Sequence, residues 1–213
     1  SAKSEAKSVI DVAADEGATA AQARKNPALW LLIVMAGFFV IAAGMMQQFS
    51  SYASTGALGA AVGAMGVTVC MIGQLFGKFG LGWLCDHTGA RVSGVVASIF
   101  GAAGIAIVLF SVDNAMMFYV GVFLFGIGFA ALNIVPPMAC RQAFGQKDYA
   151  NIFSMVATGL NVFSGFSALI YAQIFDITGS FAGCFYLIIG FYVVTLICSL
   201  VIVPMGRRSW AKK

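Results

Sequence analysis

The sequence predicts an all-α integral membrane protein with six transmembrane helices, and three observations support this fold class. First, 61% of the 213 residues are hydrophobic and only 9% are charged, which is more apolar surface than a water-soluble globule of this length can bury. Second, the apolar residues form runs of about 20, enough to cross a hydrocarbon core of about 30 Å. Third, these runs lack the apolar–polar alternation of barrel strands, so the spans must be helices.

The predicted spans are separated by short polar segments. The chain divides into a charged, Ala-rich leader (1–27), a six-helix bundle (28–204) and a basic tail (205–213). We expect the leader to be a solvated cytoplasmic linker, and because the chain begins with Ser1 we expect it to belong to a longer protein. The second and fourth spans are long enough to require tilt or bending. The six spans are 28–49, 57–83, 92–110, 115–139, 152–175 and 183–203.

The basic residues predict the orientation. If both termini are cytoplasmic, the loops on the opposite side hold Asp113 and Asp176 and no basic residue, which is the positive-inside bias. We therefore expect a protein integral to the cytoplasmic membrane. No basic stripe with interleaved aromatic residues lies outside the spans, so we expect no nucleic-acid partner. The basic residues on the cytoplasmic side are Lys3, Lys7, Arg24, Lys25, Arg91, Arg141, Lys147, Arg207, Arg208, Lys212 and Lys213.

The titratable residues argue against an enzyme. His87 is the only histidine, so neither a zinc site nor a His-based nucleophilic triad can be assembled. We expect no catalytic residue, no metal and no cofactor. A self-contained oligomeric channel or membrane scaffold remains an alternative of another class, although the sequence shows neither a charged ring nor a glycine-rich filter.

The segment 82–91, between the second and third spans, is the most informative. Gly89 suits a left-handed turn between two helices, and Gly82 would let the second span approach a neighbour closely. Asp86 is expected to face a helix N-terminus or Arg91. A hairpin with solvated charges and no functional role would explain the spacing about as well.

This spacing resembles the motif Gly-x-x-x-Asp-(Arg/Lys)-x-Gly-(Arg/Lys)-(Arg/Lys) of major facilitator superfamily transporters. Gly82, Asp86, Gly89 and Arg91 match it, and the resemblance implies that they form a gating loop that helps to hold one alternating-access state. His87 and Ala90 stand where the family has a basic residue. These departures weaken the family's charge network but leave the turn geometry intact.

Two further stretches resemble the C-terminal half of such a transporter. The charged leader resembles the linker between halves, and segments 144–153 and 176–180 resemble the flanks of the eleventh helix. The resemblance implies two inverted three-helix repeats, an N-terminal six-helix half as partner, and a substrate site near the midplane between the halves. The third and sixth spans carry no charged or amide side chain in their cores and are expected to be peripheral.

Lys78, in the second span, is the sharpest candidate for contact with a substrate. A lysine inside a span is costly and usually faces a cavity or a partner, and Gln74 shares its helical face. Because Lys78 lies only about 9 Å from the expected end of the span, snorkelling or a structural pair is the competing interpretation. The predicted substrate-binding residues are Lys78, Gln74, Asn161, Gln47 and Asn133.

Segment 78–86 also resembles the eighth helix of the oxalate/formate antiporter and monocarboxylate transporter branches. There an Arg eight residues before the loop Asp contacts the substrate carboxylate, and Lys78 occupies that place. The fifth span lacks the second cation of the oxalate transporter, so the resemblance favours a small organic monoanion, carried by exchange or proton symport. No membrane-embedded acid is present, so a proton-coupling carboxylate would lie in the other half. A carrier of a neutral solute or drug is the nearer alternative.

Small residues form two more patterns. Ser154, Thr158, Asn161 and Gly165 recur at helical spacing along the fifth span, and either interhelical packing or cavity lining would explain them. Gly73 and Gly77 in the second span form a small-x-x-x-small pair, which we expect to contact the missing half. Pro136 and Pro137 are expected to bend the fourth span.

Overall fold

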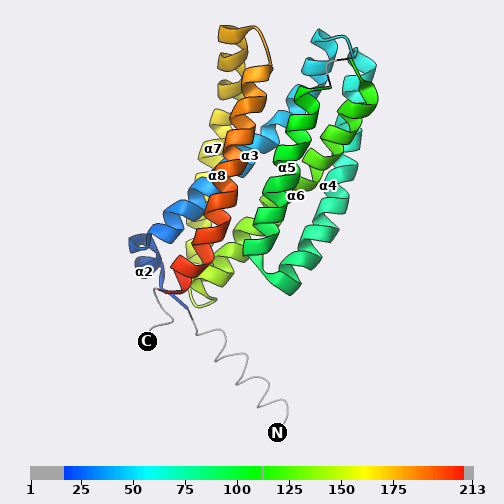
Figure 1. Cartoon of the computed structure of the whole chain (residues 1–213). Coiled ribbons are helices and arrows are strands. Elements are labelled where there is room, and N and C mark those ends of the chain that lie inside the picture. Colours follow the sequence, from blue (N-terminus) through cyan, green and yellow to red (C-terminus); the bar gives the residue numbers. More distant parts are fainter. Residues whose placement is uncertain (1–16, 112, 209–213) are drawn as a thin grey trace.

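The computed structural model describes residues 17–111 and 113–208, and within these residues the chain forms one short and six long α-helices (Figure 1). Each long helix has the length and composition needed to cross a membrane, which confirms the six predicted spans. The outer parts of the leader (1–16) and of the basic tail (209–213) lie outside the described residues. The helices are α2 (Ala20–Lys25), α3 (Pro27–Thr55), α4 (Ala60–Thr88), α5 (Ala90–Leu109), α6 (Ala115–Phe144), α7 (Tyr149–Thr178) and α8 (Ala182–Arg207).

Most of the long helices extend beyond the apolar runs that predicted them. Helix α3 ends at Thr55 rather than at 49, and α4 ends at Thr88 rather than at 83. Asparagine side chains cap the starts of two long helices: Asn26 accepts from the Ala28 N–H at 2.9 Å where α3 begins, and Asn114 accepts from the Met117 N–H at 3.1 Å where α6 begins. The apolar run therefore locates each helix, whereas main-chain hydrogen bonding decides where the helix ends.

The packing relates the helices as two triplets, α3–α5 and α6–α8. The middle helices α4 and α7 pack mainly on the first helix of the opposite triplet, α6 and α3 respectively. The last helices α5 and α8 likewise pack on α6 and α3, and they also pack on each other. This reciprocal arrangement agrees with the predicted pair of three-helix repeats, and it places α3 and α6 at the centre of the bundle.

Helices α5 and α8 are more than the peripheral elements that their apolar sequences predicted. Ser98 on α5 and Thr195 on α8 share a buried hydrogen bond of 2.9 Å, and Tyr192 is 1% exposed between the two triplets. Both helices still expose large apolar side chains, such as Phe100 and Ile197. They are therefore peripheral on one face and form the core of the bundle on the other.

Glycines bring α4 into close contact with α6. A Cβ atom on Gly73 would collide with the carbonyl oxygen of Phe123, and a Cβ atom on Gly77 would lie 2.8 Å from the Cβ of Ala130. The expectation that Gly73 and Gly77 contact a missing half is therefore wrong. They bring α4 against α6 of the same bundle, and the rest of the α4 surface remains available for other contacts.

The inner part of the leader is docked on the bundle rather than solvated, contrary to expectation. The Ala18 N–H donates to the Phe144 carbonyl at 2.7 Å, and the Ala20 N–H donates to the Asp148 carboxylate at 2.7 Å. Both Ala18 and Ala23 are fully buried. Residues 17–26 therefore form part of the folded unit, because the turn between α6 and α7 offers acceptors for their main-chain donors.

Candidate functional site

The two ends of the bundle differ in charge. Helix α2, the α4–α5 turn, the α6–α7 turn and the end of α8 meet at one end, here called the basic end (Figure 1). The alternating helix directions bring Arg91, Arg141 and Arg207 to this end, while Asp113 and Asp176 lie at the other. The basic residues that the sequence assigned to one side of the membrane thus lie together wherever the structure describes them.

The predicted gating loop is almost entirely helical. Helix α4 continues to Thr88 and α5 begins at Ala90, so Gly89 is the only residue between them. Gly89 has φ 90° and ψ 168°, a positive-φ conformation open to glycine but different from the expected left-handed turn. The Gln142 side chain on α6 accepts from the Ala90 N–H at 3.0 Å. This contact ties the turn to the end of α6.

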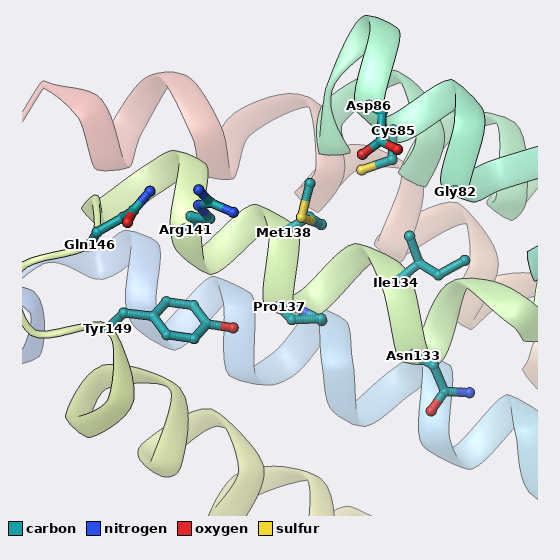
Figure 2. Close-up of a pocket in the computed structure, with 10 residues that line it drawn as sticks. All are labelled: Gly82, Cys85, Asp86, Asn133, Ile134, Pro137, Met138, Arg141, Gln146 and Tyr149. Atoms are coloured by element: carbon teal, nitrogen blue, oxygen red, sulfur yellow. The ribbon is translucent and has the colours of Figure 1, made fainter. Parts of the chain in front are cut away.

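A pocket of about 600 Å³ opens at the basic end between α4, α6 and the start of α7, and we call it the α4–α6 pocket. Figure 2 shows the α4 residues on one side, the α6 residues across the middle and Gln146 and Tyr149 at the far end. It joins two predicted gating residues to one predicted substrate residue. Its lining residues are Gly82, Cys85, Asp86, Asn133, Ile134, Pro137, Met138, Arg141, Gln146 and Tyr149.

Within this half, Gly82 and Asp86 do not make the contacts that the sequence suggested. No atom outside the local helix lies within 4 Å of the position that a Cβ on Gly82 would occupy, so this glycine borders the pocket instead of allowing a close helix contact. In the described part of the chain, Asp86 forms no ion pair with Arg91 and no hydrogen bond with a helix N-terminus. Asp86 instead shares the α4–α6 pocket with Arg141. Exchanging the oxygen and nitrogen of the Gln146 amide, as its donor neighbours require, lets the oxygen accept from the Arg141 Nε at 3.1 Å.

The outer surface of helix α4 carries both polar and large apolar residues. Gln74, Lys78, Gly82 and Asp86 recur every four residues, and we call this row the α4 polar stripe; it leads directly into the pocket. Large apolar side chains are exposed beside this stripe: Met71 and Leu75 lie next to it, and Ile72, Phe76, Phe79 and Trp83 form what we call the aromatic face. Lys78 is exposed on the polar stripe, ten residues before Thr88, or about 15 Å along the helix axis. It therefore lies deeper from the helix end than the apolar run suggested.

The other predicted substrate residues lie on different helices. Asn133 on α6 lines the α4–α6 pocket, whereas Gln47 on α3 and Asn161 on α7 are exposed outside it. Asn161 lies on the row of Ser154, Thr158, Asn161 and Gly165, all of which are exposed. Packing inside this bundle therefore does not explain the row. The structure brings Asn133 together with Gly82 and Asp86, and it does not gather all five substrate candidates into one cavity.

The pocket also contains residues to which the sequence analysis gave no site role. Arg141 served only as an orientation signal, and Gln146 and Tyr149 only as part of a resembling segment. The sequence spacing could have indicated that Arg141 lies near Asn133, because Asn133, Pro137 and Arg141 lie one turn apart on the same face of α6. A second, smaller pocket of about 320 Å³ at the opposite end is lined by Gln48 rather than by its neighbour Gln47.

Helices α4 and α7 contribute least to the interior of the bundle. In the most apolar 18-residue stretch of each helix, 17% of the residues are buried in α7 and 28% in α4, whereas 50% are buried in α3. The same two helices carry Gln74, Lys78 and Asn161. Lys78 and Asn161 are exposed on the outside of this bundle, and Gln74 is half-buried.

Comparisons with known proteins agree with this architecture. No protein-family model matches the chain. The chain is similar to the uncharacterized MFS-type transporter YhjX of Escherichia coli (strain K12), with 27% identity over 151 residues, covering 68% of this chain and 36% of that protein. In fold it is similar to the crystal structure of an auto-inhibited POT family peptide transporter, with a TM-score of 0.67, 19% identity, and coverage of 86% of this chain and 38% of that one.

The chain thus spans a little over a third of the length of the proteins that it matches. Its six membrane-spanning helices, its reciprocal triplets and these two similarities agree with one another. The chain is an integral membrane protein with the fold of one six-helix half of a major facilitator superfamily transporter.

Proposed function

We propose that this chain is the C-terminal half of a secondary transporter that carries a small organic monoanion by alternating access. The observation that carries the proposal is the position of Lys78. This cation lies on the polar stripe of α4 and not on the aromatic face beside it, and in the described part of the chain no carboxylate pairs with it. A lysine in a transmembrane helix usually faces a water-filled cavity or a partner charge.

The charge balance along the helices favours a monoanion. Lys78 is the only charged side chain of α4 that lies more than one turn from the end of the helix at the basic end. The polar stripe adds the uncharged amide of Gln74. The body of α7 contributes Asn161 and no charge before Asp176. In this proposal Lys78 neutralises the carboxylate, and Gln74 and Asn161 orient it. A lysine is a point charge without the bidentate fork of arginine, so the site would accept carboxylates of varied shape.

The second half of the site belongs to an N-terminal six-helix partner. Lys78 on α4 and the polar row of α7 are exposed on this half, and in transporters of this architecture substrates bind between the two halves. Gly82 and Gly89 shape the inner end of the path, and Asp86 and Arg91 bias the gate. We further propose that the basic end is cytoplasmic, in line with the positive-inside rule, and that a carboxylate coupling transport to protons lies in the partner half.

The test is counterflow of radiolabelled formate, acetate, L-lactate and pyruvate into liposomes that contain the chain together with its N-terminal half. We expect uptake of at least one monocarboxylate and none of oxalate. Lys78→Gln should abolish uptake at unchanged expression, and Lys78→Arg should retain part of it. Lys25→Gln, which removes an exposed cation of α2, is the matched control and should transport normally.

The alternatives give different results. A neutral-solute carrier would transport none of these anions and would be indifferent to Lys78→Gln. A channel would conduct without counterflow and would not require the N-terminal half. Uptake that persists in Lys78→Gln would make Lys78 a snorkelling residue and remove the monocarboxylate assignment, while leaving the fold assignment untouched.

A further inference from the structure

A second groove at the basic end shares no residue with the α4–α6 pocket. It has a volume of about 520 Å³ and lies between α2, the first turns of α3 and the first half of α7. Apart from Arg24 at its mouth, its walls are almost entirely apolar, formed by residues that include Trp30, Ile33, Met155, Val162 and Phe163. Figure 1 shows α2 beside the start of α3 at this end of the bundle.

We propose that this groove binds one anionic phospholipid, with an acyl chain between α3 and α7 and the phosphate on Arg24. This inference goes beyond the proposed function, because it concerns neither the transported solute nor the polar stripe of α4. The shape of the site supports it: an apolar channel runs along two membrane-spanning helices and ends at a cation where the span begins at Pro27.

The Arg24 side chain is positioned for a phosphate. Its Nε donates to the Met155 sulfur at 3.4 Å, which holds the side chain across the mouth of the groove. Among the described residues, no carboxylate pairs with Arg24, and no hydrogen bond engages its two terminal nitrogens. A guanidinium presents parallel N–H donors that match the oxygens of a phosphate. Basic pockets between transmembrane helices are known lipid headgroup sites.

Trp30 marks the interfacial level of the groove. It is 60% exposed, and its indole N–H donates to the Arg24 carbonyl at 3.3 Å. Tryptophan at this position is typical of the boundary between headgroups and acyl chains. Val162, 54% exposed on the facing side of α7, offers an apolar surface deeper in the groove.

A lipid fits this site better than an apolar helix of a partner half. A helix laid over the groove would cover Arg24, and a covered cation without a counter-charge is strongly disfavoured in a membrane. An anionic headgroup supplies the counter-charge and leaves it at the water interface. One phospholipid would thus supply both the counter-charge for Arg24 and an acyl chain for the apolar walls.

The experiment uses Trp30 as the reporter. Of the three tryptophans, Trp83 and Trp210 are replaced by Phe, and the chain is reconstituted in phosphatidylcholine vesicles that contain a minor fraction of phosphatidylglycerol. Bromine is placed on the acyl chains of one lipid or the other. We expect brominated phosphatidylglycerol to quench Trp30 about fivefold more per mole than brominated phosphatidylcholine, the preference that one basic side chain confers.

Variants distinguish lipid binding in this groove from a general attraction of anionic lipid to the basic end. Arg24→Gln should remove the preference for phosphatidylglycerol, whereas Lys25→Gln, the neighbouring cation outside the groove, should keep it. Val162→Phe should fill the groove and reduce quenching by both lipids. Equal quenching per mole by the two lipids, or an equal loss in Lys25→Gln and Arg24→Gln, would overturn the proposal. A Trp30 that neither lipid quenches would place protein over the groove and would overturn it as well.

Discussion

The Asp148 carboxylate accepts a hydrogen bond of 2.7 Å from the main-chain N–H of Ala20, and this contact fastens the leader to the turn between α6 and α7. The same carboxylate accepts from the Asn151 side chain at 2.6 Å, which holds it in place. One residue therefore organises both the start of α7 and the docking of α2. The leader enters the bundle beside two candidate sites, the α4–α6 pocket and the groove at Arg24.

Removing this carboxylate should release the leader. In Asp148→Ala the Ala20 N–H loses its acceptor, so we expect the docked segment to open more often and trypsin to cleave after Arg24 and Lys25 several-fold faster. Asp176→Ala, which removes a carboxylate at the opposite end of the bundle, is the matched control. If both variants are cleaved at the rate of the unmodified chain, Asp148 does not hold the leader.

The docking should also depend on pH in a defined direction. The hydrogen bond from the Ala20 N–H, followed by that from Asn151, lowers the pKa of Asp148 below its ordinary value of 3.8. A carboxyl group with a lowered pKa stabilises the folded state fully above its ordinary pKa and loses that contribution as the pH falls through the lowered value. Hydrogen-exchange protection of residues 18–23 should therefore exceed that of Asp148→Asn at neutral pH, and the difference should vanish only in strong acid. A difference that vanishes near pH 6 would contradict this assignment.

Two glycines of α4 should respond oppositely to the same substitution. Gly73→Ala drives a methyl group into the Phe123 carbonyl, so we expect a loss of about 1–3 kcal/mol from overpacking. Gly82→Ala meets no neighbour within 4 Å, and alanine favours a helix by about 1 kcal/mol, so it should leave the thermal stability in detergent unchanged or raise it. Equal melting temperatures for the two variants would contradict the α4–α6 contact described above.

The turn at Gly89 should not tolerate a side chain. Its φ of 90° is unfavourable for L-residues, and a Cβ there would lie 3.1 Å from Gln142 Oε1. We expect Gly89→Ala to cost about 1–3 kcal/mol and to lower the melting temperature in detergent. Gly80→Ala, at an open helical position of the same hairpin, serves as the control. A variant as stable as this control would mean that the turn relaxes to another conformation.

The fold was predictable from the sequence because lipid imposes a simple rule on helix length and hydropathy. That rule locates the apolar run in α4 but not its last turn, because His87 and Thr88 are polar and still hydrogen-bonded into the helix. It also misses the docked leader. Nothing local in residues 17–26 indicates that Ala18 and Ala20 will find acceptors more than a hundred residues away.

The candidate site was predictable only along single helices. The one-turn spacing of Gln74 and Lys78 predicts a shared face of α4, and of the residues that continue this spacing only Gly82 and Asp86 line the α4–α6 pocket. Whether α4 residues share a pocket with Asn133 and Arg141 depends on how α4 packs on α6. Glycines such as Gly73 allow that packing, but the sequence does not indicate which helix Gly73 will contact.

The central claim is that Lys78 recognises a carboxylate in a water-filled path along the α4 stripe. The most direct test starts from a background without the five native cysteines, which are all buried, and measures how fast a membrane-impermeant thiol reagent modifies Gly82→Cys in the presence of the N-terminal half. We predict rapid modification that a small monocarboxylate slows, and we predict that this protection disappears in Lys78→Gln. Phe79→Cys on the aromatic face should react slowly throughout. Modification of Gly82→Cys that no monocarboxylate slows, or protection that survives Lys78→Gln, would contradict the claim.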